Sequence, residues 1–414
     1  MVLVLRRRGL VQLFGALGLI ASVIVAGPLG TGRGVAETPE PRATGPSPRS
    51  VGAKTGFAQG HTILWGSDAQ LAADLDGMAR SGAGWIRVDF DWPSIQSGGR
   101  DAWNWGPTDR VVLAAKARGL SVLAVPAYTP AWARAAGTNG HHPPTDVGDF
   151  ARFVDEAARR YAPMGVHHWE IWNEPNLGEF WQPAPDPVAY ARLLIAASNA
   201  IHAADADAFV MNGGLAPATD VFGDAMAPRN FLFVMYAQGA GPALDAVGMH
   251  PYSFPYAPMH HGDWNTFSTL PQTHAVMAHF GDGRKQIWAT EAGFGTGRDE
   301  HSVNETVQAL RVRQILDAWR EFDFAGNIFF YTYRDLNPWS SLAFDRMGLV
   351  RADGSAKPAL AVFKGVMDDT DVDRLVRRGL CGPAAHLAPA GTDACVETRV
   401  VARFVRARIL AARG

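Results

Sequence analysis

The sequence predicts a (β/α)8 barrel of the α/β class, with an N-terminal signal and linker and a short C-terminal extension. From Phe57 onward, short runs of β-branched and aromatic residues alternate eight times with longer stretches of helical periodicity. Such alternation is typical of βαβ units and a parallel sheet. The chain has 414 residues, which suits one barrel of about 250 residues with extensions.

The N-terminal residues have the pattern of a targeting segment. Three arginines at positions 6–8 precede an apolar run over residues 10–26, and small residues at 34–36 offer a cleavage site. This order is typical of a secretory signal peptide, which we expect over residues 1–36. An uncleaved membrane anchor is the alternative. We therefore expect a secreted or cell-envelope-associated protein.

Composition divides the remainder of the chain into three parts. Residues 37–56 are rich in Gly, Pro, Thr and Ser and lack apolar periodicity, so a flexible linker is expected there. The barrel is predicted over 57–368. A basic extension over 369–414 carries the two cysteines, Cys381 and Cys395, for which a local disulfide and two free thiols are equally open alternatives.

Eight candidate strands occupy the barrel segment. Helical signals separate them: a buried face repeats over residues 150–161, Asp186 caps a helix that starts with Pro187, and Ser302 with Glu305 has the capping-box spacing. A doubly wound open sheet is the alternative fold, but no glycine-rich phosphate loop follows the first strand. The predicted strands are residues 58–65, 84–90, 120–126, 166–172, 208–213, 244–250, 286–291 and 326–333.

Charge and ligand spacing exclude several classes of function. The chain has 38 basic and 40 acidic residues, a net charge of −2, so nothing favours nucleic acid or a membrane surface as a partner. His167 and His168 are adjacent on a strand and would point to opposite faces. No cysteine or carboxylate stands near the histidines at metal-ligand spacing. We expect neither a metal nor a cofactor.

Two glutamates stand at the ends of predicted strands. The fourth strand runs into WEIWNEPN over residues 169–176, which places Glu174 at its end, and the seventh strand ends at Glu291. Barrel enzymes carry their reacting groups at the C-terminal ends of strands, and these two strands lie across the lumen from each other. Two facing carboxyl groups suit glycoside cleavage, in which one protonates the departing oxygen and the other attacks the anomeric carbon.

The WEIWNEPN run in this position resembles the acid/base motif of clan A glycoside hydrolases. Over residues 57–368 the pattern is most similar to glycoside hydrolase family 39 and related bacterial exopolysaccharide-cleaving barrels. The resemblance implies that Glu174 is the general acid/base and Glu291 the nucleophile. It also implies that Asn173 hydrogen-bonds the sugar 2-hydroxyl.

The same resemblance implies further site residues. His250 corresponds to a site histidine, Tyr252 to a tyrosine that contacts the nucleophile, and Arg87 to an arginine that keeps the nucleophile ionised. Glu170 is interpreted as a buried structural carboxylate near Arg87. The family pattern has a Trp at the end of strand eight, where Tyr331 is the nearest match here. Family 39 xylosidases also carry a β-sandwich, for which the chain after the barrel is too short.

Loops after the strands supply aromatic and histidine side chains that could bind sugar. Trp132 and His142 follow the third strand and Trp181 follows the fourth, and all three are candidates for substrate contact. Further tryptophans, Trp264 and Trp339, follow strands six and eight. Packing is the alternative for each tryptophan taken singly, although we expect at least two of them to contact sugar.

The sequence thus predicts a retaining glycoside hydrolase that cleaves β-type bonds in an extracellular poly- or oligosaccharide, with endo action slightly favoured. A transglycosylase of the same chemistry and a non-catalytic carbohydrate-binding barrel are the alternatives. A non-catalytic barrel typically lacks one of the two carboxylates, and both are present here. The only expected partner is the saccharide, apart from a membrane if the N-terminal anchor stays uncleaved.

Overall fold

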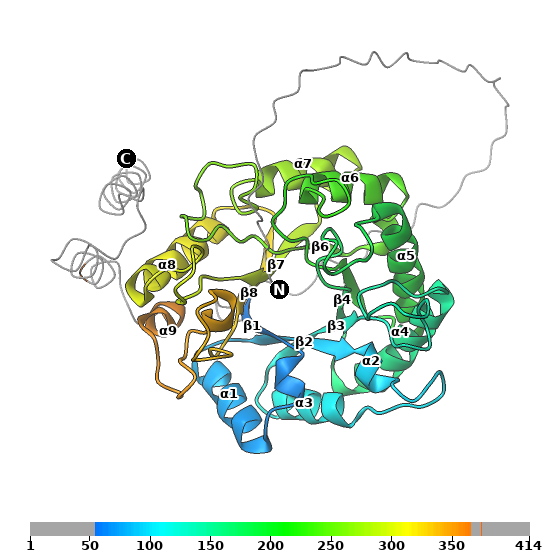
Figure 1. Cartoon of the computed structure of the whole chain (residues 1–414), viewed down its shortest axis with the longest axis horizontal. Helices are drawn as coiled ribbons and strands as arrows, with labels where there is room; N and C mark the ends of the chain where they lie inside the picture. Colours follow the sequence, from blue (N-terminus) through cyan, green and yellow to red (C-terminus); the bar gives the residue numbers. More distant parts are fainter. Residues whose placement is uncertain (1–53, 366–373, 375–414) are drawn as a thin grey trace, which may run out of the picture. The chain divides into compact units, whose positions relative to one another are not determined.

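The computed structural model describes residues 54–365 and residue 374. These residues form a closed barrel in which eight parallel strands follow one another in chain order and β8 pairs with β1. Figure 1 looks into the ring of strands, which the helices surround. The predicted signal segment, most of the linker, both cysteines and the extension other than Arg374 lie outside the described residues.

Strands and helices alternate around the barrel. The strands are β1 (Thr55–Gly60), β2 (Trp85–Asp91), β3 (Ser121–Ala127), β4 (His168–Ile171), β5 (Phe209–Asn212), β6 (Ala246–Met249), β7 (Gln286–Ala292) and β8 (Ala325–Tyr331). The α-helices are α1 (Asp68–Arg80), α2 (Trp92–Ile95), α3 (Gly106–Lys116), α4 (Val147–Tyr161), α5 (Pro187–Ala204), α6 (Pro228–Ala237), α7 (Leu270–His279), α8 (Glu305–Arg320) and α9 (Pro358–Phe363).

All eight predicted strands are present, and one is displaced. The first strand was expected over 58–65 but spans Thr55–Gly60, because the chain turns at His61 into a short 3-10 helix, η2 (Thr62–Leu64). The barrel therefore begins within the predicted linker, before position 57. Helix α4 has the predicted buried face, with Phe150, Phe153 and Tyr161 fully buried.

The two predicted helix caps have different outcomes. Asp186 caps α5 as expected, since its carboxylate accepts from the backbone N–H groups of the second and third helical residues. The capping box of Ser302 and Glu305 is wrong. Asn304 caps α8 instead, accepting from the backbone N–H of Val307 at 2.9 Å. The Ser302 hydroxyl donates to Asp299 at 2.6 Å and is not available to the helix.

Side chains alternate along the strands between two cores. On β2, Ile86, Val88 and Phe90 point outward into the large apolar layer beneath the helices, so Arg87 and Asp89 point into the lumen. In the lower lumen a second cluster of side chains, here called the aromatic floor, packs with ring centroids 4.7–6.3 Å apart. It consists of Trp85, His168, Phe209, Trp288 and Phe329.

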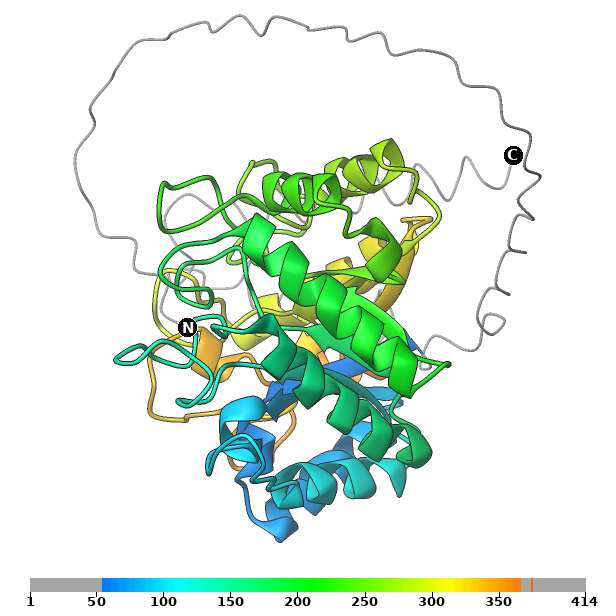
Figure 2. The same cartoon turned by 90° about the vertical axis from the view of Figure 1, so that its right-hand side faces the viewer.

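The helix layer covers the outside of the barrel. Figure 2 shows α4 and α5 lying side by side along the wall, where they pack closely. Within residues 54–365, no helix combines the length and the apolar character needed to cross a membrane.

Candidate active site

Glu174 lies just beyond β4, in a turn that brings it over the mouth of the lumen. Its backbone has φ 47°, and that of Trp172 has φ 73°, so two residues other than glycine adopt the costly left-handed conformation. Hydrogen bonds hold the turn: the Glu174 N–H donates to the Gly214 carbonyl at 3.2 Å. The Trp172 indole N–H donates to the Phe180 carbonyl at 2.8 Å. The fold therefore stabilises a strained backbone that aims one carboxyl group.

Glu291 projects from β7 toward the same point. Arg87 Nη1 donates to its Oε1 at 2.7 Å, and the Tyr252 hydroxyl donates to its Oε2 at 2.8 Å. A carboxylate oxygen of Glu291 and one of Glu174 lie within 4.8 Å of each other. This spacing fits the pair of about 5–5.5 Å that attacks an anomeric carbon directly, because a wider gap is needed to admit a water between the carboxylates.

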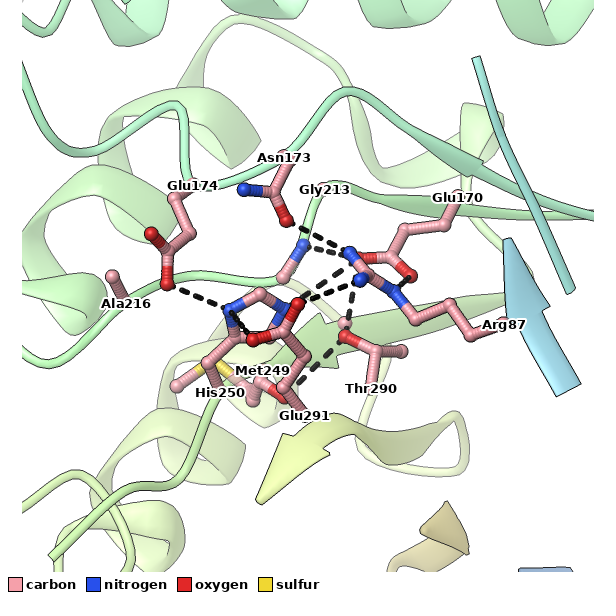
Figure 3. A network of polar contacts seen from close by, with 12 residues as sticks. Arg87, Glu170, Asn173, Glu174, Gly213, Ala216, Met249, His250, Thr290 and Glu291 are labelled. Atoms are coloured by element: carbon pink, nitrogen blue, oxygen red, sulfur yellow. Dashed lines mark hydrogen bonds and ion pairs between the residues drawn. The ribbon is translucent and has the colours of Figure 1, made fainter. Parts of the chain in front are cut away.

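Arg87 joins three strands at the centre of the network (Figure 3). Besides Glu291, its guanidinium donates to both oxygens of Glu170, at 2.7 and 3.0 Å, and to Asn173 Oδ1 at 2.8 Å. Glu170 also accepts from the Gly214 N–H at 2.7 Å. Burial would raise the pKa of Glu170, but Arg87 and further hydrogen bonds hold it at about 2. Glu170 is thus a buried, ionised anchor for the guanidinium, as predicted.

His250 lies between the two glutamates. Its Nδ1 is 2.8 Å from Glu174 Oε1 and 3.7 Å from Glu291 Oε2. Burial alone would lower the pKa of His250, but the carboxylates around it, Glu291 foremost, raise it to about 9. A Cβ at Gly214 would stand 2.1 Å from His250 Nε2, so only glycine leaves room for the ring.

The electrostatics of Glu174 differ from those of Glu170. Burial raises the pKa of Glu174, and the charge of Glu291 adds to this effect, while the hydrogen bond from His250 opposes it. Within the part of the chain that the structure describes, Glu174 Oε2 is buried without a hydrogen-bond partner. A proton on that oxygen can therefore pass only to a bound ligand or to water.

Glu174, His250 and Glu291 are close enough together to be considered as metal ligands, since one ligand atom from each lies within 4.8 Å of the others. The raised pKa of His250, about 9, keeps its ring protonated at neutral pH. Without a bound cation, the cluster is therefore described as an imidazolium between two carboxyl groups.

The remaining predicted site residues lie at different depths. Tyr331 ends β8, and burial followed by the charges of Glu291 and Asp89 raises its pKa, which places its hydroxyl among the acidic groups. His142 is half-buried in the loop after β3, and its Nδ1 has no partner among the described residues. Trp339 is 88% exposed on the loop after β8.

Two of the predicted sugar-contacting tryptophans serve packing. Trp181 is 1% exposed and packs between Trp172 and Tyr190 at centroid distances of 5.3 and 5.5 Å, so its ring belongs to the packing in this structure, and substrate contact by this residue stays a prediction. Trp132 is half-buried, donates its indole N–H to the Gln96 carbonyl at 2.8 Å and meets Trp92 edge-on. Its ring supports the loop after β3.

Sequence reasoning missed two polar residues of the site. Asp89 follows Arg87 by two positions on β2, and that spacing was the signal that both face the lumen. Tyr128 directly follows β3. Burial raises its pKa, and the charges of Asp89 and Glu174 raise it further, so its hydroxyl lies near both carboxyl groups.

Residues 49–319 match the sequence model of a family described as cellulase (glycosyl hydrolase family 5). The matched stretch is more than half of the chain and contains both glutamates. No curated protein matches the chain significantly.

Several solved structures share the fold. A family 39 glycoside hydrolase from the gut symbiont Bacteroides cellulosilyticus WH2 superposes with a TM-score of 0.64 at 20% identity, over 77% of this chain and 64% of its own length. A monomeric β-xylosidase from Caulobacter crescentus CB15 gives 0.58 at 20% identity, over 76% and 67%. A GH5_18 protein from Bifidobacterium longum gives 0.53 at 15% identity, over 76% and 77%. The chain thus spans about two thirds of the first two proteins.

Proposed function

Because the chain belongs to glycosyl hydrolase family 5, the cellulase family, we propose that it cleaves β-type glycosidic bonds by a two-glutamate, retaining mechanism. The observation that carries the proposal is the 4.8 Å limit on the separation of the Glu174 and Glu291 carboxylate oxygens. This separation matches the close pair of retaining enzymes, at about 5–5.5 Å, rather than the wider gap that admits an attacking water.

In the first step, Glu291 attacks the anomeric carbon while Glu174 gives its proton to the departing glycosidic oxygen. The attack requires an anion, which Arg87 Nη1 and the Tyr252 hydroxyl stabilise by charge-assisted hydrogen bonds. The raised pKa of Glu174 keeps its proton available, and its Oε2 has no hydrogen-bond partner among the described residues. General acid help of this kind contributes about 10² to 10⁴ in rate.

In the second step, Glu174 removes a proton from water, which attacks the glycosyl ester on Glu291. Esterification neutralises Glu291, so one contribution to the raised pKa of Glu174 disappears. The imidazolium of His250, 2.8 Å from Glu174 Oε1, then favours the ionised form. The network therefore shifts Glu174 from acid to base as the reaction proceeds.

We also propose that the substrate is an extracellular poly- or oligosaccharide and that the protein is secreted or associated with the cell envelope. The support is the basic and apolar N-terminal segment over residues 1–36. Endo action on a polymer fits a barrel whose loops after the strands surround the two glutamates.

The proposal is tested with activated aryl β-glycosides and with polysaccharides whose products are sized. Glu291→Gln should abolish turnover without changing the fold. Glu174→Ala should retain activity on substrates with good leaving groups, and added azide should accelerate it by replacing water as the nucleophile. NMR of the first-formed product should show the anomer with retained configuration. Wild-type rates in both variants on an unactivated glycan, or an inverted product, would contradict the mechanism.

A further inference from the structure

Asp89 occupies the lumen face of β2, one step nearer the mouth of the barrel than Arg87. Its neighbours Val88 and Phe90 are buried in the outer apolar layer, which leaves the Asp89 side chain directed inward. The strand pairs with β3 on one side, where Asp89 is opposite Val125, and with β1 on the other. A carboxyl group is thus held on a rigid strand at the edge of the site.

Within the described part of the chain, this carboxyl group has no hydrogen-bond or ion-pair partner. Across residues 54–365, no hydrogen bond or ion pair reaches its oxygens, whereas Glu170 in the same lumen accepts from Arg87, Gly214 and Thr290. Asp89 is half-buried, and polar groups in such places ordinarily find a partner. Burial raises the pKa of Asp89 to about 6 even though Arg87 acts to lower it. The cost of desolvating this group is therefore only partly offset by the charged groups near it.

The space beside Asp89 belongs to the reacting centre. Burial raises the pKa of Tyr331, and the negative charges of Glu291 and Asp89 raise it further. The charge of Asp89 also adds to the raised pKa of Tyr128. These tyrosines come from β8 and β3, which flank β1 and β2. A Cβ placed on Gly60 would be 3.8 Å from Asp89 Oδ2, so the absence of a side chain at this position leaves the carboxylate accessible from β1.

We propose that Asp89 is a substrate-binding residue that accepts hydrogen bonds from neighbouring hydroxyl groups of the glycosyl unit transferred to Glu291. A carboxylate is an acceptor with two oxygens, and a pair of adjacent hydroxyls supplies two donors in matching positions. The same negative charge disfavours a uronic acid at that position and selects an uncharged sugar. This inference rests on the proposed function and specifies the class of sugar that the site accepts.

The test uses the aryl β-glycoside that the wild-type protein hydrolyses fastest, together with its monodeoxy derivatives. Asp89→Asn should lower kcat/KM on the parent by about 10- to 100-fold, the range for losing a hydrogen bond to a charged group. On the derivative that lacks the contacted hydroxyl, the same substitution should cause little further loss, because both changes remove one interaction. The ratio of activity on the aryl β-glucuronide to that on the β-glucoside should rise in Asp89→Asn.

A structural role for Asp89 would give a different result. The inference is overturned if the fold losses in kcat/KM from Asp89→Asn and from deoxygenation multiply at every hydroxyl position. It is also overturned if the ratio of glucuronide to glucoside activity is unchanged in Asp89→Asn. Asp91→Asn is the matched control, since Asp91 is on the same face of β2 but accepts a hydrogen bond from the Ser94 hydroxyl. The fold loss in kcat/KM from Asp91→Asn should multiply with the fold loss from deoxygenation at every position. Asp89→Ser, checked by thermal unfolding, replaces Asp89→Asn if that variant misfolds. A separate result would contradict the proposed function itself: Glu291→Gln would then still turn over substrate.

Discussion

Glu170→Gln tests the energetic role of the buried anchor beneath the active site. In the folded protein, Arg87 and the neighbouring hydrogen bonds lower the pKa of Glu170 from 4.5 to about 2, against the effect of burial. Each unit of difference between the folded and unfolded pKa corresponds to about 1.4 kcal/mol, so ionised Glu170 contributes about 3 kcal/mol to the free energy of unfolding at pH 7. Removing the charge should cost about that amount.

The contribution of Glu170 to the free energy of unfolding should decrease as the pH falls. Because the folded pKa is the lower one, the contribution of Glu170 is complete above pH 4.5 and is lost as the pH falls toward 2. Urea unfolding of wild type and Glu170→Gln should therefore differ by about 3 kcal/mol at pH 7 and by less than half of that at pH 3. The measurement is the unfolding free energy extrapolated to zero urea at each pH.

The control removes an exposed charge. Asp68 pairs with Arg110 at 2.7 Å, but its side chain is 88% exposed, so Asp68→Asn should change the unfolding free energy by less than about 1 kcal/mol. A Glu170→Gln variant as stable as wild type at pH 7 would refute the reasoning. A difference that persists undiminished at pH 3 would refute it equally, because the effect would then not come from the charge.

Three further predictions give measurable outcomes. Tyr252→Phe removes the hydroxyl that donates to Glu291 at 2.8 Å and should lower kcat/KM by about 10- to 100-fold in steady-state assays, with the thermal midpoint nearly unchanged. Burial lowers the pKa of His168 to about 4, so wild type should lose stability as the pH falls from 6.5 to 4, and His168→Phe should abolish that loss in urea titrations. Lys357→Met leaves Asp335, its buried partner at 2.7 Å, uncompensated and should cost about 3–5 kcal/mol of unfolding free energy; adding Asp335→Leu should recover most of it.

Side chains on the strands could be predicted from the sequence because strand geometry fixes where they point. The period of two places Arg87 in the lumen, and it places Glu170 beneath the turn that carries Glu174. The order of strands in a closed barrel then brings Glu291 to the same mouth. The predicted (β/α)8 fold and the resemblance to clan A are confirmed, the matching sequence model being that of family 5, with family 39 among the similar structures.

Loop residues could not be predicted in this way. Trp181 follows β4 by ten positions, and no periodicity indicates that its loop folds back against Tyr190. The cap of α8 was misplaced for a related reason: Ser302 and Asn304 are both good capping residues, and the hydrogen bond from Ser302 to Asp299 depends on a turn that the sequence pattern does not specify. Asp89 was missed although its spacing from Arg87 was visible.

The aromatic floor determines from which end of the barrel reactants reach the two glutamates. Its closely packed rings, among them Trp85 and Trp288, which meet edge to face at 5.6 Å, block passage along the barrel axis, so reactants can approach the glutamates from one end alone. A polysaccharide substrate of the proposed kind would therefore lie across this opening, because it would have no exit at the other end of the barrel. The leaving fragment and the incoming water share a single entrance, and departure of the first clears the path for the second.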